Sequence, residues 1–287
     1  MKKYFVFFLC FVFSSFQFIN SSNNSTKELE INLISQEDQA HLDLFFKTLL
    51  FDEGGIYTLM GDKPVSIGYF LKTFPFSITH LNNCDWSIFS LRPMGTFWNS
   101  WKKNRHLFKS KNYMLFEEEN YKLDYVSFII LLNKRAFIKK VDEHLETFKN
   151  ILGNDISGKS LLKQVIEGTP LITECLRKSE LLLGILLGYG GHNASLFDIR
   201  NTVLLSGNKL FPLDYPEDAF SPPFSNMGSL EKGGHFPKKF ALPVFSSERK
   251  HPETIKLREK YNKQRAEIIK ELSQKSHMEI VFKQLVE

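Results

Sequence analysis

The chain has 287 residues, of which 43% are apolar and 24% are charged, and its formal charge is +5 at pH 7. These values exclude an intrinsically disordered chain, and three cysteines in this length exclude a disulfide-rich scaffold. The small positive charge is spread along the chain, whereas nucleic-acid-binding domains concentrate Lys and Arg on one face. We therefore expect one large or two modest globular domains and no nucleic-acid partner.

The N-terminal segment has the order of a secretory signal peptide. Two lysines precede an apolar run from Tyr4 to Ile19, and the sequence becomes polar from Asn20. As a helix, this run would rise about 24 Å, less than the ~30 Å hydrocarbon core of a bilayer. We predict a signal peptide at 1–21, a flexible leader at 22–34, and export to the periplasm, the envelope or the medium. No alanine-type cleavage motif follows the run, so an uncleaved anchor is an alternative, and membrane contact is expected only through this segment.

Removal of the signal would take Cys10 with it and leave Cys84 and Cys175 as the two thiols. In an oxidising compartment these two would form one disulfide, or they would be small buried apolar residues. We favour the second interpretation, because sequence does not show whether their α-carbons approach within the ~7 Å that a disulfide needs. Cys84 with His80 and Asp85 also has the residue types of a Cys-His nucleophile, but the spacing alone is weak support.

Helical and strand periodicity alternate between residues 35 and 133. The expected elements are, in chain order, a helix over 35–51, strands over 56–60 and 65–71, a helix over 95–108, and strands over 112–118 and 121–133. A capping-box pattern at Ser35 begins the first helix, and Gly54 and Gly55 end it. The first two strands flank a Gly-Asp-Lys-Pro turn and predict a hairpin. The last strand is apolar enough to lie in the middle of a sheet.

Basic residues alternate with aromatic ones between Trp98 and Lys111. Such a pattern can hold single-stranded nucleic acid through phosphate attraction and base stacking. It is also the pattern of an amphipathic helix whose aromatic rings face the core and whose lysines lie in solvent. We favour the amphipathic helix, because this is the only local excess of basic residues in the chain.

The second half is predicted to be helical apart from one long segment. Helices are expected over 135–152, 157–167, 174–189, 192–205 and, highly charged, over 249–274. The segment 206–245 is rich in proline, glycine and aromatic residues, which favours an irregular strap lying on the body over a disordered linker. The fold class that follows is α+β, with a small, mostly antiparallel sheet in the N-terminal half and a helical C-terminal half. The expected divisions are a body at 35–205, the strap at 206–245, and a C-terminal charged helix region at 246–287.

The sequence GNDISGKS at 153–160 matches the phosphate-binding loop pattern G-x-x-x-x-G-K-S. In such a loop the backbone at Gly153 and Gly158 surrounds phosphates, and Lys159 reaches the outer ones. The Ser160 hydroxyl then binds magnesium at a helix N-terminus. The loop requires a buried strand directly before it, yet the preceding residues have helical spacing. We interpret the match as a false positive, because a helix ended by Gly153 and a second helix begun by Ser157 account for every residue.

A second constellation is GYGGHNASLFD at 188–198. Its three glycines allow positive φ, so His192 and Asn193 could be presented at a helix start as a general base or a polar ligand, with Asp198 further along. The favoured interpretation is a helix ended by glycine and a second helix opened by Asn193. The chain has no H-E-x-x-H and no C-x-x-C motif, so we expect no metal site, and we expect no cofactor.

Two blocks of sequence resemble a known group of proteins. The blocks LLFDEGGIYTLMGDKPVSI (49–67) and LLLGILLGYGGHN (181–193) look like those of uncharacterised exported proteins of chlamydia-like bacteria. The resemblance covers residues 35–210. It implies a bacterial, envelope-related context, and it brings no activity and no site residues.

These observations predict an exported binding or interaction protein, with an unknown protein or envelope ligand as its partner. The reason is that no set of residues resembles an assembled catalytic site, although catalytic groups can converge from distant positions. The alternative is an extracytoplasmic hydrolase that uses His192 in a pocket under the 206–245 strap. A nucleotide-binding protein with its site at 153–160 is less favoured.

Overall fold

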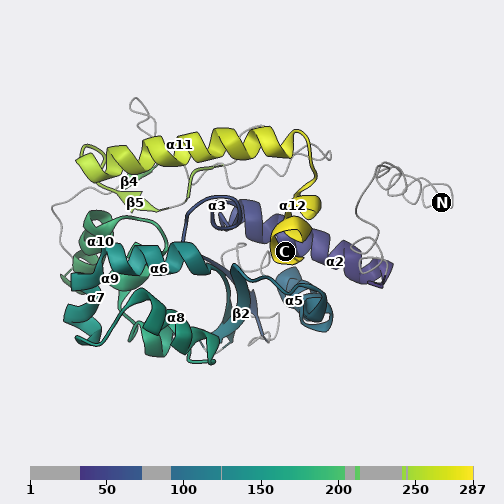
Figure 1. Ribbon diagram of the computed structural model, residues 1–287, viewed down its shortest axis with the longest axis horizontal. Helices are drawn as coiled ribbons and strands as arrows, with labels where there is room; N and C mark the ends of the chain where they lie inside the picture. Colours follow the sequence, from purple (N-terminus) through teal and green to yellow (C-terminus); the bar gives the residue numbers. More distant parts are fainter. Residues whose placement is uncertain are drawn as a thin grey trace, which may run out of the picture. The chain divides into compact units, whose positions relative to one another are not determined.

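The computed structural model describes residues 33–72, 92–123, 125–203, 211–213, 241–243 and 245–286 (Figure 1). The chain divides into two compact units, 1–36 and 37–287, and the second contains the globular body. The predicted signal peptide, the predicted strap between 214 and 240, and the group Cys84, His80 and Asp85 lie outside the described residues.

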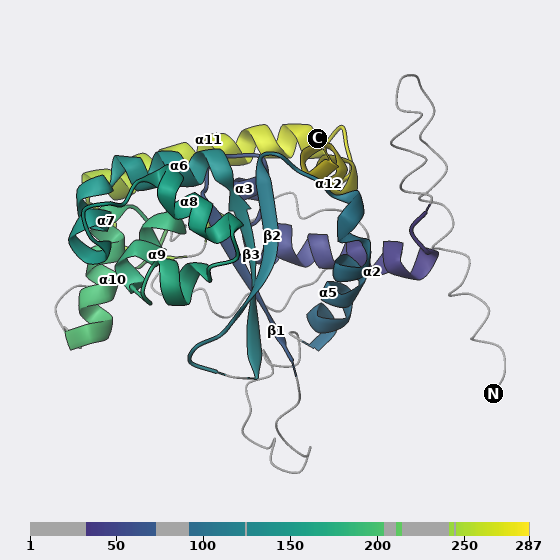
Figure 2. The same cartoon turned by 60° about the horizontal axis from the view of Figure 1, so that its bottom comes forward.

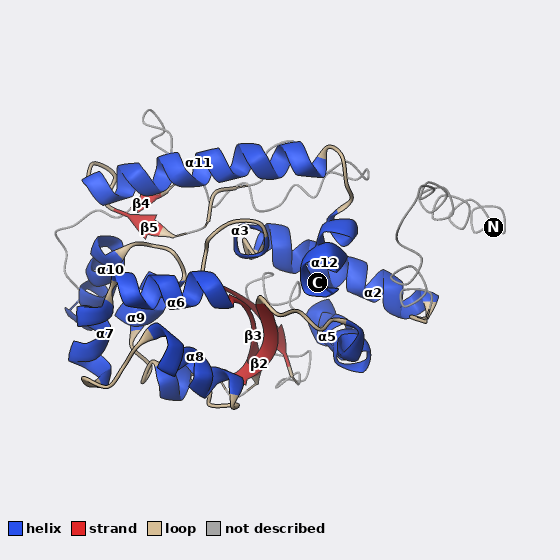
Figure 3. Ribbon diagram, viewed as in Figure 1, coloured by secondary structure: helices blue, strands red, loops and turns tan. Residues whose placement is uncertain are grey.

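The described part is mostly helical, with one small sheet (Figure 3). The helices are α2 (Gln36–Lys47), α3 (Ile56–Leu59), α5 (Arg92–Asn104), α6 (Lys134–Glu143), α7 (Leu145–Leu152), α8 (Gly158–Ile166), α9 (Glu180–Leu186), α10 (Gly191–Val203), α11 (Pro252–Leu272) and α12 (His277–Val286). Two short π-helical turns are η1 (Thr48–Asp52) and η4 (Leu171–Cys175), and η3 (Arg105–Leu107) is a 3₁₀-helical turn. The strands are β1 (Val65–Leu71), β2 (Tyr113–Glu119), β3 (Val126–Asn133), β4 (Phe211–Pro212) and β5 (Ser246–Ser247). The predicted α+β class is confirmed.

The three longer strands form one antiparallel sheet in the order β1-β3-β2. Val65 of β1 pairs with Leu132, and Tyr113 of β2 pairs with Asn133. The apolar strand β3 is central, as predicted, although it begins at Val126 rather than at residue 121. The Asn133 side chain ends this strand and begins α6, because its oxygen accepts a hydrogen bond from a backbone N–H in the first turn of that helix.

Helices cover both faces of the sheet (Figure 2). Mainly aliphatic side chains pack on one face and aromatic side chains on the other. Ile130 and Leu132 of β3 belong to an aliphatic cluster shared with α6, α7, α8 and α9. Ile129 and Leu131 alternate with them and therefore lie on the opposite face, where they are also buried. On that face a ring of Phe70 from β1 contacts Trp98 of α5.

The second face is dominated by an aromatic cluster made by α2, α5 and the end of η3. Its rings are those of Phe45, Phe46, Trp98, Trp101 and Phe108, with neighbouring centroids 4.7–6.5 Å apart. All five side chains are buried, whereas the lysines between them are exposed. The amphipathic-helix interpretation of 98–111 is therefore confirmed for the aromatic residues, and α5 itself ends at residue 104.

The long helix α11 runs beside α3 and the β4–β5 pair (Figure 1). Tyr261 and Ile268 of its thin apolar stripe are buried, as the charged-helix prediction required. Strands β4 and β5 pair at the two described ends of the predicted strap, and the Leu213 N–H donates to the Phe245 carbonyl oxygen at 3.2 Å. Among the described helices, none combines the length and the apolar character needed to cross a bilayer.

The predicted hairpin at 56–71 is wrong in its first half. Residues 56–59 form the short helix α3 instead of a strand, and all four of its side chains are buried. Ile56 and Tyr57 favour strands by intrinsic propensity, but burial on every side removes the alternation that distinguishes the two structures. Gly54, with φ +66°, turns the chain into this helix, and the Gly55 N–H donates back to the Leu49 carbonyl oxygen at 2.9 Å.

Two other predicted helices differ from the structure in their boundaries, and one helix was not expected. The helix expected over 135–152 is broken at His144, which ends α6 and begins α7. The helix expected over 174–189 is a π-helical turn followed by the shorter helix α9, separated by Arg177 and Lys178 at positive φ. The helix α12 was not expected. Its sequence HMEIVFKQLV buries His277, Ile280 and other residues against the body.

Candidate functional site

The Gly-rich turn between α9 and α10 is where sequence analysis placed its catalytic candidates. Gly188 and Gly190 have φ of +85° and +82°, a conformation that side chains rarely adopt. A Cβ at Gly188 would lie 2.1 Å from the Tyr261 hydroxyl oxygen, and one at Gly190 would lie 2.6 Å from the Glu253 carboxyl carbon. These glycines let the turn approach α11 closely. We call residues 188–193 together with 245–254 the α10–α11 joint.

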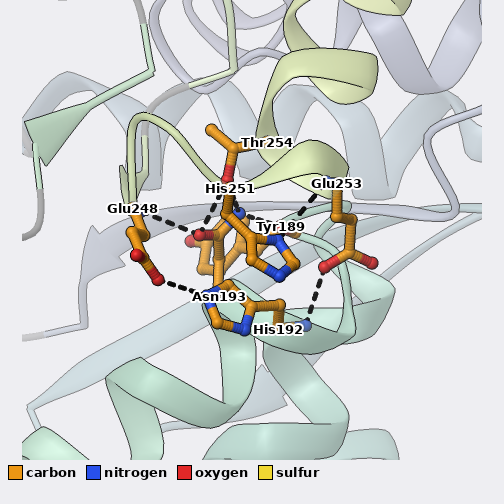
Figure 4. Close-up of polar contacts among 7 residues, drawn as sticks. All are labelled: Tyr189, His192, Asn193, Glu248, His251, Glu253 and Thr254. Carbon is orange, nitrogen blue, oxygen red and sulfur yellow. Dashed lines mark hydrogen bonds and ion pairs between the residues drawn. The ribbon is translucent and has the colours of Figure 1, made fainter.

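Asn193 is fully buried in the joint and connects three backbone or side-chain groups (Figure 4). Its Oδ1 accepts from the Glu248 N–H at 2.9 Å, and the Thr254 hydroxyl lies within 3.1 Å of the same atom. Its Nδ2 donates to the Tyr189 carbonyl oxygen at 3.0 Å, which lies four residues earlier. The side chain therefore fixes residues 246–254 against the start of α10, and it does not open the helix as a cap.

The first turn of α10 is bound by a carboxylate from α11. The Glu253 Oε1 accepts from the Gly191 N–H at 2.9 Å, and its Oε2 accepts from the His192 N–H at 2.8 Å. The first N–H groups of a helix lack partners within the helix and carry partial positive charge, so a carboxylate is their favourable partner. Glu253 thus supplies the capping group that the Gly-rich turn lacks (Figure 4).

The His192 ring lies between a carboxylate and a second imidazole. Its Nε2 is 2.6 Å from Glu248 Oε2, and the two side chains are 29% and 45% exposed. The His251 ring stacks on it with centroids 3.4 Å apart and an interplanar angle of 10°. His251 also begins α11, because its Nδ1 accepts from the Glu253 N–H at 3.3 Å.

A third histidine approaches the same turn from the break between α6 and α7. A Cβ added at Gly191 would lie 3.1 Å from Cε1 of His144, so the ring packs directly on the turn. Burial lowers the pKa of His144, and Lys140 lowers it further, while Glu253 and Glu143 oppose that change. Sequence analysis did not single out His144 or His251, since neither belongs to a recognisable motif.

The structure brings two of the three predicted catalytic residues together and separates the third. His192 and Asn193 meet Glu248, His251 and Glu253, whereas Asp198 lies about 9 Å further along the axis of α10. Within the described residues, the polar contacts of His192 are with carboxylates, and none is with a hydroxyl or thiol nucleophile. A carboxylate-oriented imidazole is one part of a general base, and the described joint does not complete a nucleophilic pair.

A second polar cluster, which sequence analysis missed, lies beneath the joint at the start of β1. The Lys63 Nζ donates to Ser66 Oγ at 2.9 Å, and the side chains of both residues are buried. Ser66 Oγ also lies 2.8 Å from the Thr58 hydroxyl oxygen and 3.2 Å from the Gly54 carbonyl oxygen, to which it donates. The only sequence signal for this cluster is a lysine placed directly before Pro64 and a buried strand.

Burial shifts the pKa values of Lys63 in this second cluster and of the neighbouring Glu53. Loss of water lowers the pKa of Lys63 to about 8, although Glu53 opposes the shift. Burial, together with the neighbouring charge of Asp52, raises the pKa of Glu53 to about 7, which Lys63 partly counteracts. The two residues therefore titrate close to neutral pH, which is a property shared by functional groups and by strained structural pairs.

The two blocks that carry the sequence resemblance meet at this point. A Cβ at Gly188, in the second block, would lie 3.5 Å from Cγ of Lys63, in the first. The Tyr261 hydroxyl of α11 donates to the Gly188 carbonyl oxygen at 3.1 Å. The Lys63 cluster and the α10–α11 joint are therefore neighbours in one region of the protein.

The phosphate-loop match at 153–160 lies elsewhere and has the local structure that the sequence interpretation predicted. Helix α7 precedes it, and Gly153 ends that helix with φ +112°. Ser157 begins α8 in a reciprocal capping box with Ser160, and the Gly158 N–H donates to Asp142 Oδ1 at 2.8 Å. These contacts already engage the Ser160 hydroxyl and the Gly158 amide that a phosphate site would use.

The remaining predicted site residue within the described chain is Cys175. Its thiol is free and buried in the aliphatic cluster, where burial raises its pKa to about 11. This environment is that of a small buried apolar residue. In the described residues, no three His, Cys, Asp or Glu side chains are grouped in a way that would hold a metal ion.

Comparisons with protein-family models, with curated proteins and with solved structures find no match to this chain. The resemblance to exported proteins of chlamydia-like bacteria therefore stays a prediction from the sequence.

Proposed function

We propose that the protein is an exported binding or interaction protein of the bacterial envelope. The observation that carries this proposal is the arrangement of the α10–α11 joint. The buried Asn193 side chain and the backbone N–H of His192 hold two segments of the chain together, and within the described residues the polar contacts of His192 are with carboxylates. Because the residues of this turn connect two segments of the chain, we expect the protein to act through its exposed surface rather than through the turn.

One exposed surface has the charge to bind a partner. Arg105, Lys109 and Lys111 are exposed at the end of α5 and before β2. Within the described residues they form no ion pair, whereas Lys103 pairs with Asp38 at 2.6 Å. The aromatic cluster beneath fixes their backbone, so an acidic protein or envelope ligand would meet a preformed basic surface.

A hydrolase is the second candidate, and the His192–Glu248 pair favours it. The two side chains are partly exposed and 2.6 Å apart, which is the geometry of an imidazole oriented by a carboxylate. A nucleophile would have to come from the substrate, from water or from residues outside the described chain.

Export is tested first, by the intact mass of the native protein and its distribution among cytosol, membrane and exported fractions. Loss of about the first 21 residues and a product outside the cytosol are the expected results. An intact chain that remains in the cytosol would contradict the proposal and would reopen 153–160 as a phosphate site.

Binding is tested by placing a photo-crosslinking amino acid at His106, which is exposed beside Arg105, in the full chain. The matched control carries the same amino acid at Ile166, which is 55% exposed at the end of α8. A discrete crosslinked species at position 106, lost when Arg105, Lys109 and Lys111 are changed to Gln, is expected. Crosslinks of equal yield at both positions would count against a specific basic surface.

The hydrolase candidate is tested with a panel of chromogenic esters, phosphates and glycosides. Turnover that is lost in His192→Gln and kept in His106→Asn would favour the hydrolase over the binding protein. Absence of turnover across the panel, together with the specific crosslink, is the outcome that the binding proposal expects.

A further inference from the structure

We propose that the α10–α11 joint is a pH-sensitive latch, which loosens when His251 takes up a proton. The inference rests on the geometry of three histidines around one turn, and it does not depend on what the protein binds. Its parts are an imidazole used as a hydrogen-bond acceptor, a stacked imidazole pair, and the carboxylates that hold α10.

His251 needs a neutral ring to begin α11. Its Nδ1 accepts a hydrogen bond from the Glu253 N–H, and only an unprotonated ring nitrogen has a lone pair for that bond. Protonation turns this nitrogen into a donor and removes the cap. It also places a positive charge at the N-terminus of α11, where the partial charge of the helix is already positive.

The stacked pair disfavours two charged rings side by side. Glu248 Oε2 lies 2.6 Å from His192 Nε2, so a proton on the His192 ring has a carboxylate partner. A second proton would have to enter His251, whose centroid is 3.4 Å from that of His192. Two parallel imidazolium rings at this separation repel each other, so the second protonation favours a state in which the rings move apart.

The other charged groups near these rings come from two regions. Lys140 and Glu143 act on His144 at the end of α6, and Glu248 and Glu253 contact the first turn of α10. Arg249 and Lys250 directly precede His251 in the chain. Glu253 attracts a proton toward the rings, but its two oxygens already accept from the first amides of α10. His144 is held neutral by burial and by Lys140, and a proton there adds to the positive charge beside Gly191.

The direction of the pH effect follows from these contacts. A proton on His251 removes the acceptor of the Glu253 N–H, and a proton on His144 adds positive charge beside Gly191, so acidification favours the open state. Opening would free residues 246–254 and, with them, the Phe245 ring that stacks on Tyr189 with centroids 4.6 Å apart.

The test is amide hydrogen exchange of the full-length protein at pH 5.5 and pH 7.5, corrected for the intrinsic rate at each pH. Peptides covering 188–195 and 246–255 are expected to exchange about tenfold faster at pH 5.5, because the joint then loses the hydrogen bond from the Glu253 N–H to His251. A peptide covering 126–133, from the central strand, serves as the internal reference and is expected to keep its rate.

The variant His251→Asn distinguishes an effect of protonating His251 from a loss of the helix cap at this position. Asn is a good helix-capping residue and does not titrate in this range, so protection at pH 7.5 is expected to persist and the acceleration at pH 5.5 to disappear. His106→Asn, at an exposed histidine on the other side of the sheet, is the matched control and is expected to behave like the parent. Acceleration that persists in His251→Asn, or that extends equally to 126–133, would overturn the latch.

Discussion

The aromatic cluster of α5 and the α10–α11 joint hold the chain together by opposite means. Trp98 and Trp101 are buried against rings from α2, and their stability comes from apolar area and packing. At the joint, one amide, two carboxylates and two imidazoles hold a helix start against a segment more than fifty residues away. We expect the stability of the aromatic cluster to be insensitive to pH, and its buried face was predicted from the sequence. The joint is proposed to respond to pH, and the sequence does not identify its partners.

The difference shows where sequence periodicity carries information and where it does not. Aromatic residues repeated every three or four positions predict which face of a helix is buried, whatever side chains pack against that face. A buried amide such as Asn193 is satisfied only by particular donors and acceptors, and these lie on a segment that sequence spacing does not identify.

The largest effect is expected from truncating the aromatic cluster. Trp101→Ala should lower the free energy of unfolding by about 3–5 kcal/mol, because it removes a buried indole and leaves a cavity among Phe45, Phe46 and Phe108. Urea unfolding at pH 5.5 and 7.5 should give the same loss, since none of these rings titrates. A loss that differs strongly between the two pH values would show that the stability of the aromatic cluster also depends on pH, and the proposed difference between the two regions would be wrong.

Lys63, below the joint, is expected to give the next largest effect, and it depends on pH. Its pKa is about 8 in the folded protein and 10.5 without burial, so between these values the unfolded chain binds a proton that the folded protein does not. The free energy of unfolding should therefore rise with pH across this window, by about 3 kcal/mol. Lys63→Met should abolish that rise in urea titrations from pH 7 to 10.5.

Two controls accompany the Lys63 measurement. Lys103→Met, at a side chain that is 68% exposed, should leave the rise unchanged. Glu53→Gln should act in the acid range, because its pKa is raised from 4.5 to about 7. There the folded protein binds the extra proton, so stability should fall as pH increases from 4.5 to 7 in the parent and stay level in the variant. A rise above pH 8 that persists in Lys63→Met would place its origin at another group.

Asn193→Ala tests the joint against a matched amide in α5. It leaves the Glu248 N–H and the Tyr189 carbonyl oxygen without their partner, so a loss of about 2–3 kcal/mol is expected from thermal or urea unfolding. Asn104→Ala removes another buried amide, but one that donates to the Ser100 carbonyl oxygen of its own helix. Its expected cost is about 1 kcal/mol, and equal losses at the two positions would remove the special role of the joint.

The smallest effect on stability is expected at the basic surface. Changing Arg105, Lys109 and Lys111 together to Gln should alter the free energy of unfolding by less than about 0.5 kcal/mol, because all three are exposed and unpaired within the described residues. Size-exclusion and unfolding measurements check the fold of the variant. A large destabilisation would show that these side chains serve the fold rather than a partner.

Much of the fold could be predicted because its elements carry local signals in the sequence. The start of α8 at Ser157 and the central place of β3 followed from a capping residue and an apolar run. The helix α3 could not be predicted, because all four of its residues are buried and the sequence therefore shows no alternation of polar and apolar positions. At the site, the glycines pointed to His192 and Asn193, but nothing in the sequence relates them to Glu248 or Lys63.

The pairing of β4 with β5 has a consequence for how the chain tolerates alteration. Residues 211–213 and 245–247, which flank the segment 214–240, are hydrogen-bonded to each other, and α11 is attached to the body through Tyr261 and the joint. A protease cut between the paired ends, or expression of the two pieces from separate genes, should therefore still give an assembled protein. Each doubling of the length that connects these paired residues would cost only about 0.6 kcal/mol of closure entropy, so the pairing tolerates a connection of widely varying length.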